Sequence, residues 1–317
     1  MILDGNPVAE KVLAEVRAGV ARLQRERGVT PGLAVLLLGT DPASGLYVRS
    51  KKRMAASVGI ASPDYVYPDG LGRTQLLELI DRLNADPAIH GILPQLPLPK
   101  GIDEDEVIAR IAPEKDVDGI HPVNLGRLLA GAPAVLPCTP AGCMEILDHY
   151  GAKLEGAEAV MIGRSRIVGK PLAQLLLARH ATVTMCHTRT ADLPFHTRRA
   201  DVLCVAAGRA GVVTGDMVKP GAWVIDVGNT QLPSGKWVGD VDFDAVAARA
   251  HVTPVPGGVG PMTRAMLMKN TLLAAGRFLG GGLCPPSDGP RTPDGALGPA
   301  SPQQELRGQS PRSKATD

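Results

Sequence analysis

Short apolar runs that end in glycine recur along this 317-residue chain and alternate with segments of helical periodicity. Strands buried on both faces are continuous in Val, Ile and Leu, and such strands belong to parallel sheets covered by helices. The alternation therefore predicts an α/β protein, in which loops at the carboxyl ends of the strands form the site. The glycine-ended runs lie at 33–39, 157–163, 200–208 and 222–228.

The order of these segments predicts two domains. A helix over 7–27, with its apolar residues in one stripe, precedes a β, α, β, α, β series that ends near residue 96. A helix from Pro140 to about Tyr150 leads into a second unit, and Thr263 is expected to cap a last helix that runs through Leu279 and packs back on the first unit. We predict that residues 1–139 plus 263–280 form a substrate and catalytic domain and that residues 140–262 form a Rossmann-like dinucleotide-binding domain. Residues 281–317, rich in Gly, Pro and Ser, are predicted to be a disordered tail.

Charge, aromatic content and cysteine spacing exclude several classes of protein. Lys and Arg number 34 against 32 Asp and Glu, and aromatics make up 3% of residues, which argues against a nucleic-acid-binding surface. The first residues do not form a signal peptide, and no apolar run approaches the ~18 residues that cross a bilayer. We expect a soluble cytoplasmic protein with no membrane partner, no bound metal and five reduced cysteines, Cys138, Cys143, Cys186, Cys204 and Cys284.

Tyr47 and Lys51 are the first candidates for chemistry. Asp41 followed by proline predicts a helix start, and Gly59 suits its end, so the two side chains lie one turn apart on one face. A phenol beside an amine handles protons, and partial burial with the neighbouring cations of residues 52 and 53 would lower the pKa of Lys51. The alternative is a solvated basic helix whose tyrosine packs on the core.

Gln95 and Asp118 lie where their side chains can join that pair. Gln95 follows a strand that ends near Pro94, because proline cannot donate to a sheet ladder, and its side chain could reach Lys51. The loop over 113–124 holds Asp116 and Asp118. Two carboxylates without further ligands make a poor metal site, so a carboxylate that binds an N–H-rich ligand fits better.

The second unit begins with a dinucleotide-binding pattern. A βαβ segment over 157–187 carries Gly163, Ser165 and Gly169 in its first turn, where backbone N–H groups and a helix start would face a pyrophosphate. This glycine spacing differs from the common G-x-G-x-x-G motif.

The end of the second strand favours NADP over NAD. An NAD site usually places an acid there for the ribose 2′-hydroxyl, whereas a 2′-phosphate requires arginine. Here Thr188 and Arg189 follow the strand, Arg164 lies in the first loop, and the first acid is Asp192. The alternative is that Arg189 is simply solvated.

Six collinear motifs together resemble the bifunctional methylenetetrahydrofolate dehydrogenase/cyclohydrolase family. They span nearly the whole chain to Leu279, and their order is more specific than any one motif. The motifs are PASGLYVRSKK at 42–52, GILPQLPLP at 91–99, KDVDGIHPVNLGRL at 115–128, PCTP at 137–140, GRSRIVGKP at 163–171 and PVPGGVGPMT at 254–263.

The resemblance implies a folate cleft between two α/β domains and a homodimer. It implies NADP-dependent oxidation of 5,10-methylenetetrahydrofolate to the methenyl form, then hydrolysis to 10-formyltetrahydrofolate, a reaction pair of one-carbon metabolism. By motif position, Lys51 would be the acid/base group, Tyr47 would stack on or hydrogen-bond the folate, Gln95 would orient Lys51, and Asp118 would hold the pterin. The remaining contacts would come from Pro256, Gly257, Gly258 and Pro261 to the folate, and from Gly163, Arg164, Ser165, Thr188 and Asn229 to NADP.

Three positions depart from the family pattern. Pro94 replaces a usually aliphatic residue, residues 229–231 read Asn-Thr-Gln, and Arg166 adds a charge beside the phosphate loop that would strengthen the preference for NADP. Two other functions fit parts of the sequence. A short-chain dehydrogenase also uses Tyr-x-x-x-Lys, but there the pair follows the dinucleotide motif, and a folate- or NADP-binding protein without turnover would not need the four site residues.

Overall fold

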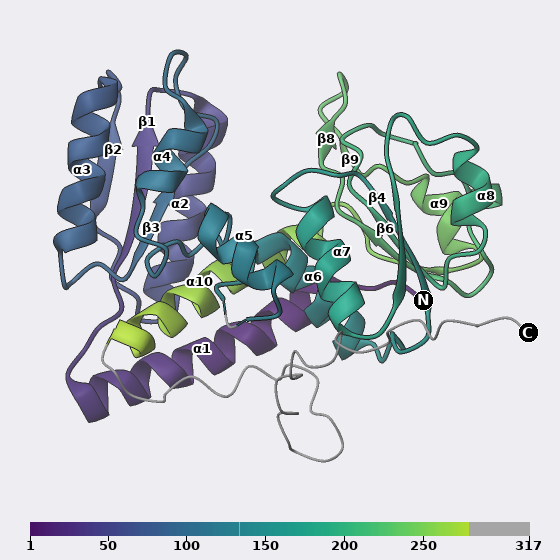
Figure 1. Cartoon of the computed structure of the whole chain (residues 1–317), viewed down its shortest axis with the longest axis horizontal. Helices are drawn as coiled ribbons and strands as arrows, with labels where there is room; N and C mark the ends of the chain where they lie inside the picture. The colour runs from purple at the N-terminus through teal and green to yellow at the C-terminus, as the bar shows by residue number, and fades with distance from the viewer. Residues whose placement is uncertain (133, 279–317) are drawn as a thin grey trace, which may run out of the picture.

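The computed structural model describes residues 1–132 and 134–278, which form two α/β lobes side by side with long helices beneath them (Figure 1). The predicted tail over 281–317 and the predicted helix end at Leu279 lie outside the described residues. Within the described part of the chain, no helix combines the length and apolar character needed to span a membrane.

The first lobe contains a three-stranded parallel sheet. β1 (Leu33–Leu38) lies in its centre and is buried throughout, between β2 (Asp64–Tyr67) and β3 (Gly91–Pro94). Pairing of β3 ends at Pro94, opposite Leu36, as expected for a residue without an N–H. The helices of this part of the chain are α2 (Pro42–Ser57), α3 (Arg73–Ala85), α4 (Glu104–Arg110) and α5 (Pro122–Leu129).

The second lobe contains a five-stranded parallel sheet in the order β10-β7-β6-β4-β5. The chain order reverses at β4, which has β5 on one side and β6 on the other, and open α/β sheets bind ligands at the carboxyl ends of strands beside such a reversal. The strands are β4 (Glu158–Ile162), β5 (Thr182–Cys186), β6 (Val202–Val205), β7 (Trp223–Asp226) and β10 (His251–Val252). The other elements are α7 (Gly169–Ala178), α8 (Leu193–Thr197), the 3-10 turn η1 (Gly215–Met217), α9 (Phe243–Ala247), and a hairpin of β8 (Thr230–Gln231) and β9 (Trp237–Val238).

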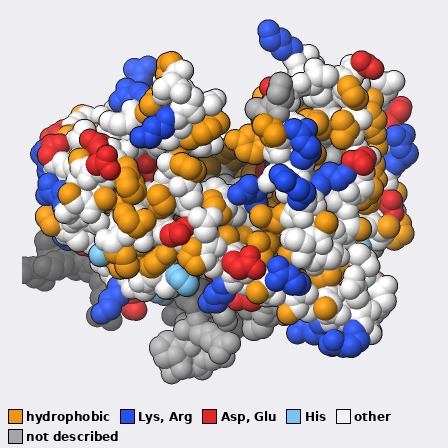
Figure 2. Space-filling view, turned by 180° about the vertical axis from the view of Figure 1, so that it is seen from behind, with side chains coloured by type: hydrophobic (Ala, Val, Ile, Leu, Met, Phe, Trp, Pro, Cys, Tyr) orange, Lys and Arg blue, Asp and Glu red, His pale blue; other side chains and the backbone are white. Residues whose placement is uncertain are grey.

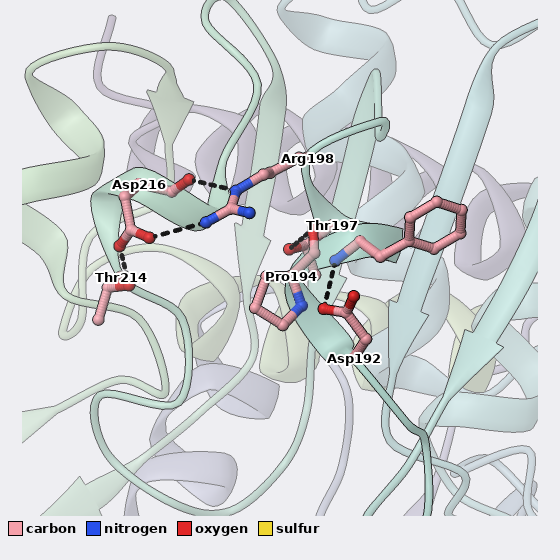
Figure 3. A network of polar contacts seen from close by, with 7 residues as sticks. Asp192, Pro194, Thr197, Arg198, Thr214 and Asp216 are labelled. Carbon is pink, nitrogen blue, oxygen red and sulfur yellow. Dashed lines mark hydrogen bonds and ion pairs between the residues drawn. The ribbon is translucent and has the colours of Figure 1, made fainter.

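A polar network fixes α8, which follows the end of β5 (Figure 3). Arg198 donates from Nε to the backbone oxygen of Asp216 at 2.9 Å and from Nη2 to its carboxylate at 3.1 Å. Asp192 caps the helix by accepting from the N–H of Phe195 at 3.2 Å. These bonds tie the chain beyond the predicted cofactor end of β5 to η1.

Three long helices join the lobes: α1 (Gly5–Arg27), α6 (Cys138–His149) and α10 (Val259–Phe278). α10 packs against both α1 and α6, so the last helix does return to the start of the chain. The predicted cap at Thr263 is wrong, because α10 already begins at Val259. Pro261 is tolerated in the first turn of a helix, where an N–H has no intrahelical partner, and Thr263 instead shares a hydrogen bond of 2.9 Å with the hydroxyl of Thr139 on α6.

Candidate active site

Lys51 lies on α2, whose start is the one that the sequence predicts. The carboxylate of Asp41 caps the helix by accepting from the N–H of Ser44 at 2.7 Å. Lys51 is half-buried, and Tyr47, one turn earlier, is 43% exposed. The alternative of a solvated helix with a core tyrosine is therefore wrong, because the amine is the more buried of the two groups.

Gln95 contacts Lys51 directly. The Nζ of Lys51 donates to Oε1 of Gln95 at 2.9 Å. The amide of Gln95 is oriented by its own Nε2, which donates to the backbone oxygen of Leu96 at 2.8 Å, and its backbone N–H donates to Leu36 at 2.8 Å. A neutral acceptor at the end of β3 thus faces the amine.

Asp116 and Asp118 have different roles in their loop. The carboxylate of Asp116 is buried and accepts from the N–H groups of residues 119, 120 and 121 and from Nδ2 of Asn124, so it shapes the turn. Asp118 instead lies close enough to Lys51 for the two charges to interact. Desolvation raises the pKa of Asp118, and the nearby Lys51 opposes that rise. Asp118 is therefore the carboxylate that remains for a ligand.

The pKa of Lys51 is lowered, as the sequence predicts, but its positive neighbour is a different residue. Desolvation by burial is the largest effect, Asp118 and then Cys138 act in the opposite direction, and the positive charge of Arg264 is a smaller effect that adds to the lowering. The prediction that residues 52 and 53 supply the positive charge is wrong. Lys52 forms an ion pair with Asp64 on β2, and neither Lys52 nor Arg53 is among the charges that act on Lys51.

Sequence reasoning missed Arg264, Cys138 and Asn270, which surround this cluster. Nη1 of Arg264, on α10, donates to the hydroxyl of Ser50 on α2 at 2.9 Å. Asn270 donates from Nδ2 to the backbone oxygens of Val117 and Leu136, both at 2.9 Å, and so holds the segments that carry Asp118 and Cys138. The available signal for two of these residues was the presence of Arg264 and Asn270 within the largely apolar segment 259–278.

The loop over 253–258 joins the second lobe to α10. The peptide bond before Pro256 is cis, Gly257 has a φ of 109°, and the N–H of Gly258 donates to the backbone oxygen of Pro254 at 2.8 Å. Gly257 also accepts from the N–H of Gly5 at 2.9 Å, so the loop packs on the start of α1. Pro256 is exposed, and Gly257 and Pro261 are half-buried.

The first turn of the second lobe allows two close backbone approaches. Gly163 follows β4 with a φ of 113°, and a Cβ there would lie 2.2 Å from the backbone oxygen of Ala206, at the end of β6. A Cβ on Gly169 would lie 2.2 Å from the oxygen of Gly163. The hydroxyl of Ser165 accepts from the N–H of Val168 at 3.1 Å and of Gly169 at 3.2 Å, so it holds the turn that leads into α7. Only glycine fits at positions 163 and 169. The sequence predicts that this turn binds the cofactor.

Polar groups gather around this turn at the carboxyl ends of neighbouring strands. Arg164 is exposed beside β4, Thr188 and Arg189 are exposed after β5, and Asn229 is exposed after β7. Arginines without an acid beside the end of β5 suit a 2′-phosphate. Arg166 forms an ion pair with Asp105 on α4, so its charge links the two lobes.

Two buried carboxylates hold the neighbouring loops. Asp226, at the end of β7, accepts from the N–H groups of Gly228 and Asp240 at 2.9 Å and of Val241 at 3.0 Å. Asp240 accepts from the N–H groups of residues 207 and 208 at 2.6 and 2.8 Å. Burial raises the pKa of Asp226 to about 6. These two carboxylates therefore hold the loops that follow β6 and β7 through backbone hydrogen bonds.

Figure 2 shows a notch between the two lobes with apolar side chains on its floor. A separate cavity of about 500 Å³ lies at the amino ends of β4 and β7, and two of its charged residues, Asp201 and Lys219, pair with each other at 2.5 Å. That cavity contains none of the predicted site residues. Among the described residues, no group of three His, Cys, Asp or Glu side chains is placed to hold a metal ion.

Family models match both lobes. The model described as the catalytic domain of tetrahydrofolate dehydrogenase/cyclohydrolase matches residues 3–118, and the one described as its NAD(P)-binding domain matches residues 137–278. The chain belongs to the tetrahydrofolate dehydrogenase/cyclohydrolase family. Its two α/β lobes are thus the catalytic and NAD(P)-binding domains of that family.

Relatives match over nearly their whole length. The bifunctional protein FolD of Streptococcus pneumoniae serotype 4 is 55% identical over 279 residues, which cover 88% of this chain and 98% of the relative. The crystal structure of the bifunctional FolD enzyme of Campylobacter jejuni has a TM-score of 0.85 and 46% identity, with 87% of this chain and 99% of that chain covered. The Trypanosoma brucei FolD structure, solved with NADP cofactor and an inhibitor, has a TM-score of 0.83 and 40% identity, with coverage of 88% and 98%.

Proposed function

We propose that this chain is a bifunctional enzyme that oxidises 5,10-methylenetetrahydrofolate to the methenyl form with NADP and hydrolyses that product to 10-formyltetrahydrofolate. Membership of the family and the full-length match to bifunctional relatives support both reactions. The observation that carries the proposal is the half-buried amine of Lys51, held by Gln95 and close to Asp118. A short-chain dehydrogenase is excluded by the family.

The turn after β4 fits NADP. Gly163 and Gly169 let the turn pack tightly on the end of β6 and on itself, as in the glycine-containing turns that bind dinucleotides. We assign the contacts to Gly163, Arg164, Ser165, Thr188 and Asn229, with Arg164 opposite the 2′-phosphate. NADP, when bound, accepts the hydride, and the task of the protein in that step is orientation.

The residues of the first lobe would bind and orient the folate. Asp118 is a half-buried acceptor suited to the N–H groups of the pterin ring, and Tyr47 presents an exposed phenol one turn from Lys51. Pro256, Gly257, Gly258 and Pro261 would line the other side. The loop that contains them leads into α10, and Arg264 on that helix bonds to α2 beside Lys51.

Hydrolysis needs a base. Water that attacks the cationic methenyl carbon must lose a proton, and a neutral amine can accept it. Desolvation favours the neutral form of Lys51, and Oε1 of Gln95 orients the amine by accepting a hydrogen bond from it. The same amine lies beside the substrate in both steps, so the methenyl product does not need to leave the site before hydrolysis.

The test is a pair of assays on one preparation. Purified enzyme with methylenetetrahydrofolate should reduce NADP faster than NAD, and added methenyltetrahydrofolate should decay faster than it does spontaneously. Lys51→Ala should abolish hydrolysis, whereas Lys52→Ala, on the same helix but paired with Asp64, should retain it. Hydrolysis retained in Lys51→Ala would remove Lys51 from this role, and ligand binding without turnover in the unaltered enzyme would indicate a binding protein.

Three broader assignments stay predictions. The packing of α10 on α1 supports the predicted domain division of 1–139 plus 263–280 and 140–262, although α10 also packs on α6 of the second unit. The homodimer and the cytoplasmic location follow from the family resemblance and the composition. Sedimentation of the purified protein would test the homodimer.

A further inference from the structure

Arg264 is a cation inside the proposed site with no carboxylate of its own. It lies in the second turn of α10, and its Nη1 donates to the hydroxyl of Ser50, the residue before Lys51. Its Nε is buried and has no hydrogen-bond partner. None of the ion pairs among the described residues includes Arg264. Its charge is therefore not neutralised by a direct partner and acts on its neighbours.

The groups that face Lys51 come from four elements besides its own helix. Gln95, after β3, is neutral, and the loop before α5 supplies the carboxylate of Asp118. α6 supplies the thiol of Cys138, which burial keeps protonated, and α10 supplies the guanidinium of Arg264. On α2 itself, the phenol of Tyr47 lies one turn away. Lys51 thus lies between one negative and one positive charge.

A base and a ligand-binding carboxylate conflict when they lie together. Asp118 favours the protonated amine, because opposite charges stabilise each other at short range and burial strengthens the effect. A protonated Lys51 cannot accept a proton from water. The carboxylate that the site needs for the pterin would therefore impair the base, unless another charge offsets it.

We propose that Arg264 is a positioning residue that keeps the Lys51 amine available as a base by offsetting part of the charge effect of Asp118 and by holding Ser50 of α2 against α10. The proposal rests on the proposed hydrolysis step for its consequence, but the charge balance is a property of the free enzyme. The lowered pKa of Lys51, to which Arg264 contributes, agrees with it.

The first experiment measures the amine itself and needs no activity. Trace acetylation of Lys51 with acetic anhydride, followed by mass spectrometry across pH, reports the fraction of neutral amine. Arg264→Gln should label more slowly at neutral pH, by up to roughly tenfold, and should recover at higher pH. Arg264→Lys should stay near the unaltered enzyme, and Arg264→Gln combined with Asp118→Asn should return toward it, because both charges are then absent.

The second experiment measures hydrolysis of methenyltetrahydrofolate across pH, after subtraction of the spontaneous rate. Arg264→Gln should lose up to roughly tenfold at pH 7 and regain activity as the pH rises. Ser50→Ala removes the acceptor of Arg264 but not its charge, so it should lower the rate without moving the pH profile. Thermal unfolding with NADP present identifies variants that do not fold. If Arg264→Gln is one of them, Arg264→Met, a second neutral replacement, takes its place in the labelling experiment. An unchanged labelling profile in Arg264→Gln, or equal losses in the Gln and Lys variants, would overturn the proposal. An inactive enzyme with the expected labelling shifts would support the charge balance and refute only the proposed function.

Discussion

Gln95→Glu is the substitution that tests the proposed base most sharply. The two side chains have nearly the same size, so the change replaces a neutral acceptor 2.9 Å from the Lys51 amine with a carboxylate. Like Asp118, the new carboxylate would stabilise the protonated form of the Lys51 amine. An opposite charge at such a distance typically raises the pKa of an amine by about 1–3 units, so the fraction of neutral amine at pH 7 should fall, by up to roughly 10- to 1000-fold.

The structure also predicts which activity falls. Hydrolysis requires the neutral amine, whereas hydride transfer requires orientation of the substrate, so the cyclohydrolase should lose far more than the dehydrogenase. Part of the cyclohydrolase loss should be recovered as the pH rises. A second effect acts on geometry: Nε2 of Gln95 donates to the oxygen of Leu96 at 2.8 Å, and a carboxylate oxygen in its place would be repelled.

Gln95→Met separates these effects, because it removes the hydrogen bonds and adds no charge. The assay is the rate of each reaction from about pH 6 to pH 9, with the spontaneous decay of methenyltetrahydrofolate subtracted. Glu should show a loss that depends on pH, and Met a smaller loss that does not. If Gln95→Glu hydrolysed its substrate with the rate and pH profile of the unaltered enzyme, Lys51 would not be the base.

Two further predictions concern the second lobe. Gly163→Ala places a Cβ 2.2 Å from the oxygen of Ala206 at a φ of 113°, so we expect a stability loss of about 1–3 kcal/mol and weaker NADP binding by calorimetry, whereas an unchanged affinity would place the cofactor elsewhere. Burial raises the pKa of Asp226 from 3.8 to about 6, so the folded state binds the extra proton, and this contribution to stability is lost as the pH rises through that window, by roughly 3 kcal/mol. Urea unfolding should therefore show Asp226→Asn gaining about that amount relative to the unaltered protein between about pH 4 and pH 7, and a difference that is constant with pH would contradict it.

The parts of the fold that depend on local signals were predictable from the sequence. The start of α2 follows from an acceptor side chain before a proline, and β1 follows from an apolar run that is buried throughout. The start of α10 was missed because a hydroxyl residue is a common cap. Here the helix begins at Val259, and Thr263 faces α6 instead, a choice that tertiary packing decides.

The charge environment of Lys51 was not predictable in the same way. The sequence shows cations next to Lys51, but Lys52 pairs with Asp64 on β2, and the guanidinium near the amine comes from Arg264, more than two hundred positions away. Likewise, Asp116 and Asp118 are equivalent in a sequence, and only the folded turn shows that the first of them is used by backbone N–H groups. Spacing along one helix predicts neighbours on that helix, whereas charge at a site depends on all the elements that converge there.

The same convergence links the two halves of the proposed reaction. Thr253 donates its hydroxyl to the backbone oxygen of Asp226 at 3.4 Å and accepts from its N–H at 2.8 Å, which ties the end of β7 to the loop that precedes α10. α10 then carries Arg264 to Ser50, beside the base. The loop over 253–258 therefore lies between β7, which leads to Asn229 on the proposed cofactor side, and the helix that carries Arg264, which we propose offsets part of the charge effect of Asp118. A site that performs hydride transfer and hydrolysis on one bound folate requires such a connection, because the ring must meet the cofactor and the amine from one position.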